Sequence, residues 1–168
     1  MSYYIGAQQS IKHWTFVVAD NYIALTLTLP CDAQRAWYEI TDWNKQGKWM
    51  LQTSVWLTSE IESGPGTEIA AFTGPFHKFF PRLKFLGVLD TMLVTNWQPP
   101  FICDVLHTGK VIKGTGRFEL TQIDAFTTRF DWSEEILAPR AIFLLIAPGL
   151  YAGVRISLMA LRRQLQSV

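Results

Sequence analysis

The sequence has few cysteines, and this excludes a disulfide-stabilised scaffold. Only Cys31 and Cys103 are present in 168 residues. The first falls at an expected helix start and the second inside an expected strand, so we expect both thiols to be reduced. The N-terminal sequence MSYYIGAQQSIKHW also lacks the basic-then-apolar order of a signal peptide. Together these features predict a soluble, cytoplasmic protein.

The sequence also lacks a surplus of charge of either sign. Fifteen Lys and Arg are balanced by fourteen Asp and Glu, giving a net charge of +1. This balance gives no support to a nucleic-acid partner. The three histidines, His13, His77 and His107, have no metal-ligand spacing, and Gly114-Thr-Gly116 is too short for a nucleotide fingerprint. We therefore expect no metal and no cofactor.

Long apolar runs are missing as well. The longest uncharged one, Ala141 to Val154, contains Pro148 and is shorter than the roughly 18 residues of a membrane span. No repeat, low-complexity tract or linker divides the chain. We expect one domain over residues 1–168, with its core at about 20–166.

Aromatic residues are abundant, with seven Trp and eleven Phe, and strand patterns dominate. Trp14 to Ala19 is β-like, and Ile23 to Leu29 alternates strictly between apolar and other residues. After Pro30, Cys31 to Ile40 and Trp43 to Trp49 are predicted as two short helices, with Asp32 at the start of the first. Six further antiparallel strands are predicted, at Thr53–Ile61, Thr67–Thr73, Gly87–Trp97, Phe101–Thr108, Val111–Ile123 and Thr127–Ile136.

A long helix is predicted to end the chain, from about Pro139 to Gln166. Apolar residues recur along it every three to four positions from Phe143 onward. Pro148 removes one hydrogen-bond donor, so the helix is expected either to kink there or to begin afresh. Its uncharged first half needs an apolar partner. The pattern therefore predicts an α+β fold in which a sheet wraps this helix.

Several motifs resemble the START/Bet v 1-like (SRPBCC) superfamily, and within it the polyketide cyclase/dehydrase and lipid-transport-like branch. The resemblance covers about residues 20–166. It is carried by Leu29-Pro-Cys-Asp-Ala-Gln-Arg-Ala-Trp-Tyr-Glu-Ile-Thr-Asp42, Trp49, Gly64-Pro-Gly-Thr67, Asn96-Trp-Gln-Pro-Pro100 and Thr128-Arg-Phe-Asp-Trp132.

The resemblance implies a helix-grip fold, in which a seven-stranded antiparallel sheet curls around the C-terminal helix and leaves a cavity. Members bind lipids, sterols, polyketides or other apolar molecules, and some catalyse cyclisation or dehydration. Fold alone does not select among these activities. By strand alternation and helix position, the residues expected to line a ligand site are Trp56, Phe72, Met92, Val94, Asn96, Val105, His107, Phe118, Leu120, Phe130, Trp132, Glu134, Ile146, Leu150 and Val154.

Three of the residues on inward faces are weak catalytic candidates. Glu134 shares a face with Phe130 and Trp132, so an apolar cavity would raise the pKa of its carboxyl and suit it to acid–base work. Solvent exposure or pairing with an arginine are the structural alternatives. His107 and Asp90 lie on neighbouring strands, where the carboxylate could orient the imidazole, although alternation does not establish that they meet.

Segment 74–85, GPFHKFFPRLKF, mixes phenylalanines with basic residues. It suits a lid formed by Phe76, Phe79 and Phe80, a transient contact with a membrane surface, or simple packing over the open end of the sheet. Three functions stay open: a carrier of a small hydrophobic molecule, an aromatase/cyclase-type enzyme acting on a polyketide-like substrate, and a docking module or homodimer formed through the apolar helix half.

Overall fold

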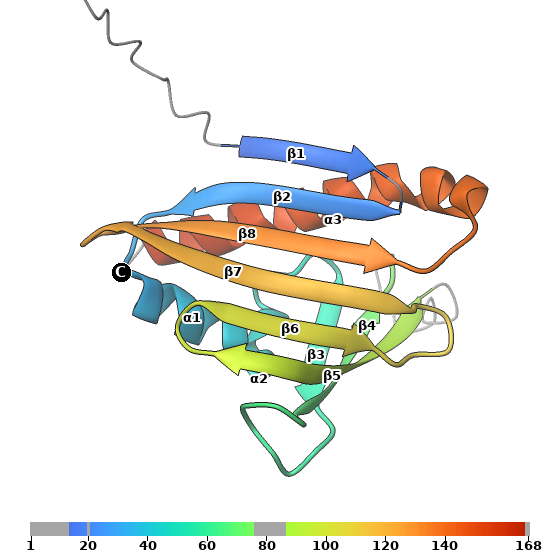
Figure 1. Ribbon diagram of the computed structural model, residues 1–168, viewed down its shortest axis with the longest axis horizontal. Coiled ribbons are helices and arrows are strands. Elements are labelled where there is room, and N and C mark those ends of the chain that lie inside the picture. The colour runs from blue at the N-terminus through green and yellow to red at the C-terminus, as the bar shows by residue number, and fades with distance from the viewer. Residues whose placement is uncertain (1–13, 20, 76–86, 167–168) are drawn as a thin grey trace, which may run out of the picture.

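The computed structural model describes residues 14–19, 21–75 and 87–166, and it has one curled antiparallel sheet with helices packed against it (Figure 1). The strand order is β1-β2-β8-β7-β6-β5-β4-β3. The elements in this part of the chain are β1 (Trp14–Ala19), β2 (Tyr22–Leu29), α1 (Ala33–Thr41), α2 (Trp43–Gln46), β3 (Thr53–Leu57), β4 (Glu68–Thr73), β5 (Val88–Gln98), β6 (Ile102–His107), β7 (Gly114–Asp124), β8 (Thr127–Ile136) and α3 (Arg140–Gln166).

The helix-grip prediction is confirmed in element order and in antiparallel pairing. The seven predicted strands are β2 to β8, and β1 adds an eighth at the edge, paired with β2. The predicted bounds that differ most from the structure are those of α2, β7 and β3, and α2 already ends at Gln46 rather than at Trp49. β7 begins at Gly114 and not at Val111, because a bend separates it from β6, and β3 already ends at Leu57.

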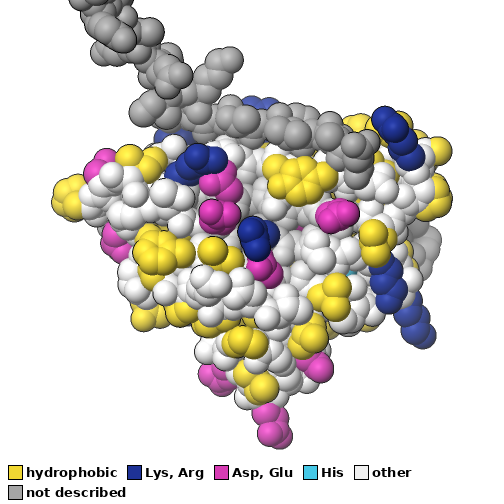
Figure 2. Space-filling model, viewed as in Figure 1, with side chains coloured by type: hydrophobic (Ala, Val, Ile, Leu, Met, Phe, Trp, Pro, Cys, Tyr) yellow, Lys and Arg dark blue, Asp and Glu magenta, His cyan; other side chains and the backbone are white. Residues whose placement is uncertain are grey.

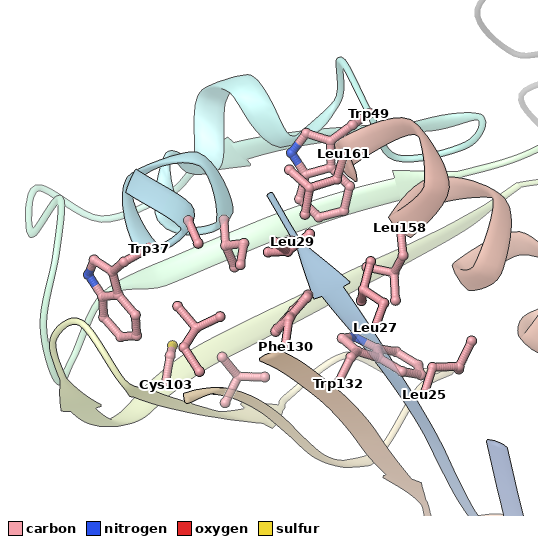
Figure 3. Packing of buried hydrophobic residues seen from close by; sticks show 14 of the residues in the cluster. Leu25, Leu27, Leu29, Trp37, Trp49, Cys103, Phe130, Trp132, Leu158 and Leu161 are labelled. Atoms are coloured by element: carbon pink, nitrogen blue, oxygen red, sulfur yellow. The ribbon is translucent and has the colours of Figure 1, made fainter. Parts of the chain in front are cut away.

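The core lies between the concave face of the sheet and the helices. The apolar face predicted for β2 is buried, with Ile23, Leu25, Leu27 and Leu29 each at most 1% exposed. Figure 3 shows Leu158 and Leu161 of α3 reaching toward this face, with Phe130 and Trp132 of β8 beside it.

Helices α1 and α2 pack against the core beside α3. The Asp32 carboxylate accepts a hydrogen bond from the backbone N–H of Arg35 at 2.9 Å, which caps α1 as the sequence predicted. Trp37 of α1 makes an edge contact with Trp97 of β5, with ring centroids 4.8 Å apart. Trp43 lies 6.3 Å from the same ring. This aromatic group ties the short helices to the sheet.

Helix α3 is continuous from Arg140 to Gln166 and contains Pro148, so the helix does not begin afresh at that residue. In Figure 1 it runs behind the sheet along β2 and β8. Its buried stripe follows the helical period and consists of Phe143, Ala147, Ser157, Leu158, Leu161 and Leu165.

Candidate functional site

A row of polar side chains crosses the concave face of the sheet. Asp90 on β5, His107 on β6 and Glu134 on β8 all lie on this face, and Gly116 on β7 lies between the last two. The strand register creates the row, because Met92 pairs with His107, Val105 with Gly116, and Gly116 with Glu134. Residues on one face of adjacent strands are close enough to interact.

Asp90 and His107 form a buried hydrogen-bonded pair. The distance between Asp90 Oδ2 and His107 Nδ1 is 2.7 Å, and both residues are less than 9% exposed. An ionised carboxylate only accepts hydrogen bonds, so the imidazole donates through Nδ1–H. The sequence placed these residues on neighbouring strands, and the structure brings them into contact. This bond fixes the ring and directs Nε2 away from Asp90.

The opposite nitrogen of the imidazole is buried without a hydrogen-bond partner in the part of the chain that the structure describes. The same holds for Asp90 Oδ1. Some buried polar side chains donate to main-chain carbonyls, as Thr67 does to Gly64 and Thr128 to Cys31. Others among the described residues have no partner, including Trp43 Nε1 and Trp49 Nε1 in the core. A buried nitrogen without a partner costs free energy, and His107 Nε2 is set apart from the tryptophans by its place beside Gly116 and Glu134 on the concave face.

Gly116 keeps the space between His107 and Glu134 free of a side chain. A Cβ atom built on Gly116 would lie 3.5 Å from His107 Nε2 and 3.7 Å from Glu134 Cγ. It would therefore stand between the two functional groups. Glycine within a strand weakens the strand and often marks close approach of another group. In the sequence, Gly116 stood out only as part of Gly114-Thr-Gly116, and no role in a site was expected for it.

The surroundings raise the pKa of both ionisable groups that flank Gly116. Desolvation raises the pKa of the Glu134 carboxyl from 4.5 to about 7, against the opposing charge of His107. Although the Glu134 side chain keeps some accessible surface, protein atoms replace most of its water. Burial alone would lower the pKa of His107, but the hydrogen bond to Asp90 and the nearby Glu134 carboxylate raise it.

The stability of the protein is expected to fall as pH rises from about 5 to 8. Both groups bind protons more tightly in the folded state, so the folded state loses stability as Glu134 ionises between pH 4.5 and about 7. His107 adds to this loss above its ordinary pKa of 6.5. Ionisation of Glu134 alone is expected to lower the free energy of unfolding by about 1 to 3 kcal/mol, where the lower value allows for screening by solvent. Urea unfolding across this pH range measures it.

Glu134→Gln is expected to remove most of this pH dependence and to be more stable than the wild type at pH 8. Glu135→Gln is the matched control, because Glu135 is the exposed neighbour on the outer face. An unchanged slope in Glu134→Gln, or an equal change in Glu135→Gln, would contradict the assignment.

Most of the predicted ligand-lining residues lie on the inner face. Val94, Val105, Leu120, Phe130 and Trp132 are buried within the core cluster. Met92, Phe118, Leu150 and Val154 are partly buried and pack against it. The partly buried set has accessible surface left to offer a ligand, whereas the fully buried set contributes mainly to stability.

Four of the predicted lining residues do not face the core. A β-bulge between Val94 and Asn96 shifts the alternation, so Asn96 pairs with Asp104 and donates to its carboxylate at 3.0 Å on the outer face. Trp97 occupies the inner position that the sequence assigned to Asn96. Trp56 alternates with buried Val55 and is 39% exposed.

Phe72 pairs with Ser54, next to buried Ala71, on the face opposite the core residues. Ile146 is 42% exposed because it lies off the buried stripe of α3. The lid residues Phe76, Phe79 and Phe80 fall outside the described residues.

The outer face of the sheet is a polar, ion-paired surface. Arg117 contacts both carboxylate oxygens of Asp104, with distances of 2.6 Å from Nε and 2.9 Å from Nη2. Figure 2 shows basic side chains beside acidic ones across this face. A shallow hollow of about 420 Å³ lies there, with Tyr22, Arg117 and Glu135 among its lining residues. It lies on the opposite side of the sheet from the polar row, so we do not assign it to the site.

Comparisons with known proteins find similarity in structure and not in sequence. No protein-family model matches the chain, and no curated protein sequence matches it significantly. Among solved structures, a protein from Rhodobacter sphaeroides aligns with a TM-score of 0.70 at 11% identity, covering 92% of this chain and 99% of that one. A START superfamily protein from Mycobacterium smegmatis aligns with a TM-score of 0.67 at 12% identity, covering 86% and 98%.

The Zhui aromatase/cyclase from Streptomyces sp. R1128 is similar to the same extent. It aligns with a TM-score of 0.65 at 13% identity, covering 86% of this chain and 93% of that one. At such low identity the likeness concerns the fold and not the activity. The chain therefore has the helix-grip fold of START superfamily and aromatase/cyclase proteins, as its sequence motifs suggested.

Proposed function

We propose that the protein binds a small hydrophobic molecule between the concave face of its sheet and α3. The observation that carries this proposal is the buried His107 Nε2, which lies near Glu134 across Gly116 and has no hydrogen-bond partner among the described residues. Apolar area supplies most of the affinity in such sites, and a few convergent polar groups fix the orientation of the ligand. A hydroxyl or carbonyl of the ligand would fill the hydrogen-bonding capacity of Nε2 and Glu134.

The cytoplasm is the proposed location. Cys31 and Cys103 are both free and buried, and burial raises the pKa of the Cys103 thiol to about 12. Two cysteines that form no disulfide are what a reducing compartment favours.

Ligand binding is tested by purifying the protein from its own host and measuring its mass under native conditions, followed by organic extraction. The expected result is a stoichiometric apolar compound. In titrations with that compound, Glu134→Gln and His107→Asn are each expected to weaken binding by about tenfold, the value of one hydrogen bond to a charged or polar group. Asn96→Ala is the matched control, because Asn96 is a polar residue on the outer face of the sheet, away from the proposed ligand.

A preparation from the host with no bound compound, and no binding of host lipid extracts, would contradict the carrier proposal. Equal losses in Asn96→Ala and in the two site variants would show that the losses reflect stability alone.

Acid–base catalysis of the aromatase/cyclase kind is the second candidate. It is supported by the pKa of about 7 at Glu134 beside a histidine whose ring is held by Asp90. A carboxyl group whose pKa is close to the surrounding pH can both donate and accept a proton at little cost in free energy. Conversion of the extracted compound, or of a polyketide-like substrate, by the wild type and not by Glu134→Gln would establish it. A ligand unchanged both in mass and in chromatographic retention after incubation would favour the carrier function, because ring closure without loss of water leaves the mass the same.

A further inference from the structure

The side of α3 that faces away from the sheet is apolar and uncovered in the described part of the structure. We call this side the outer face of α3. Its large residues, with their exposed fractions, are Ile142 (52%), Leu144 (55%), Leu145 (81%), Ile146 (42%) and Ile156 (50%). The smaller residues Ala141, Pro148, Gly149 and Ala152 are exposed among them. Soluble monomers rarely expose a continuous apolar surface of this kind.

The helical period separates the outer face from the buried stripe. At 100° per residue, Leu145, Ala152 and Ile156 fall within about 40° of one another. Phe143 and Leu158 lie on the other side and are 1% and 2% exposed. Between Ala141 and Val154 the helix is therefore apolar on both sides, a pattern that is typical of a helix buried all round.

The hydropathy of α3 supports a lipid environment. An 18-residue window of the helix has a mean hydropathy of 1.8, a value typical of membrane spans, yet only 22% of that window is buried. A core helix of such composition would be mostly buried. Crossing a bilayer is excluded by the packing of Phe143, Leu158 and Leu161 against the sheet. If the helix lies in the plane of the membrane surface, one side can pack against the sheet while the other contacts lipid.

The charges of α3 favour an anionic surface. The helix contains Arg140, Arg155, Arg162 and Arg163 and no acidic residue. Its main neighbour β2 has no charged residue either. Arg155 is exposed within about 80° of Leu145 around the helix, and Arg140 is exposed at the first turn, where its long side chain can extend past the end of the helix toward lipid phosphates. Two copies of this face packed together would bring arginines close to arginines without acidic partners on either helix, which opposes self-association.

We propose that the outer face of α3 binds the interfacial region of an anionic lipid bilayer. Leu145 and Ile156 enter the boundary between head groups and acyl chains, and Arg140 and Arg155 contact phosphates. The proposal involves no residue of segment 74–85. A bilayer is also where a hydrophobic ligand concentrates. Uptake of a ligand from the bilayer would rest on the proposed ligand binding, whereas binding of α3 to the bilayer does not.

Flotation of the protein with lipid vesicles tests the proposal. The wild type is expected to float with vesicles of equal parts phosphatidylcholine and phosphatidylglycerol, and less with phosphatidylcholine alone. Added salt should weaken the first interaction, because surface charges are screened. Leu145→Glu is expected to lower vesicle affinity by at least about tenfold, the contribution of one buried leucine. Arg140→Gln with Arg155→Gln should remove most of the preference for anionic vesicles.

Phe126→Glu is the matched control, because Phe126 is 80% exposed and lies in the β7–β8 turn, remote in the fold from the outer face of α3. It should float like the wild type. Leu145→Gln repeats the test without an added charge, and thermal unfolding confirms that each variant is folded. Binding of the site ligand in vesicle-free solution should be unchanged in Leu145→Glu, which separates a failure of docking from a failure of the carrier function.

Absence of wild-type flotation, or equal loss in Phe126→Glu, would overturn the proposal. A dimer in sedimentation that Leu145→Glu dissociates, with no vesicle binding, would also overturn it and assign the outer face to a second copy of the chain.

Discussion

Replacing Gly114 by alanine is expected to destabilise the fold by more than about 3 kcal/mol. Gly114 opens β7 with φ +139°, a conformation that residues with a Cβ rarely adopt. A Cβ there would lie 1.8 Å from the carbonyl oxygen of Glu135 on the paired strand. Main chain cannot move aside as a flexible side chain can, so β7 and β8 would separate locally. Urea unfolding at constant pH measures the loss.

Gly149→Ala is the matched control for this substitution. A Cβ on Gly149 meets nothing within 4 Å, and the residue is helical. Alanine is the better helix former, so this variant is expected to gain about 0.5 to 1 kcal/mol. A mild effect of Gly114→Ala, comparable in size to that at Gly149, would contradict the argument. Because Gly114 pairs with His107, the destabilised variant should also lose ligand binding.

Gly116→Leu is expected to weaken ligand binding by about a hundredfold or more. The leucine side chain would occupy the place between His107 Nε2 and Glu134, so the ligand would lose a hydrogen bond to each. The contact of a Cβ with Val105 Cγ2 at 3.0 Å adds a stability cost of about 1 to 3 kcal/mol. Titration with the ligand extracted from the host protein measures the affinity.

Gly116→Ala tests the same loss of ligand affinity with a smaller side chain. Its single added carbon is 3.5 Å from the imidazole nitrogen, an ordinary contact, and 3.0 Å from Val105 Cγ2, which must shift slightly. This variant should therefore bind the ligand more weakly than the wild type but better than Gly116→Leu. Both variants should retain the Asp90–His107 hydrogen bond. If Gly116→Leu is folded and binds with wild-type affinity, the ligand does not occupy this place.

The sequence allowed the fold and part of the site to be predicted because strand alternation is a local property. It placed His107, Val105 and Glu134 on the inner face, and each of them lies there. It could not place Asn96, since the β-bulge after Val94 reverses the alternation and leaves no clear mark in a single sequence.

The contact between Asp90 and His107 depends on register, which belongs to a pair of strands and not to either one. Likewise, the exposure of Leu145 could not be predicted. An apolar helix half indicates that a partner exists, but the amount of that face which the sheet covers is decided by packing.

The neighbour order of the strands has a consequence for how the chain folds. From β3 to β8, each strand pairs with the next in sequence, so this meander can assemble through local contacts as the chain is synthesised. β2 pairs with β1 on one side, which is local, and with β8 on the other side, which is distant in the sequence. The hydrogen bond from Thr26 to Asp131 on β8, for example, spans 105 residues.

The apolar face of β2 therefore stays exposed to solvent until β8 and α3, at the end of the chain, have been synthesised. We expect the β1–β2 hairpin and α3 to dock last, and pulse-labelling hydrogen exchange should find protection of β2 amides arising after that of β6 and β7.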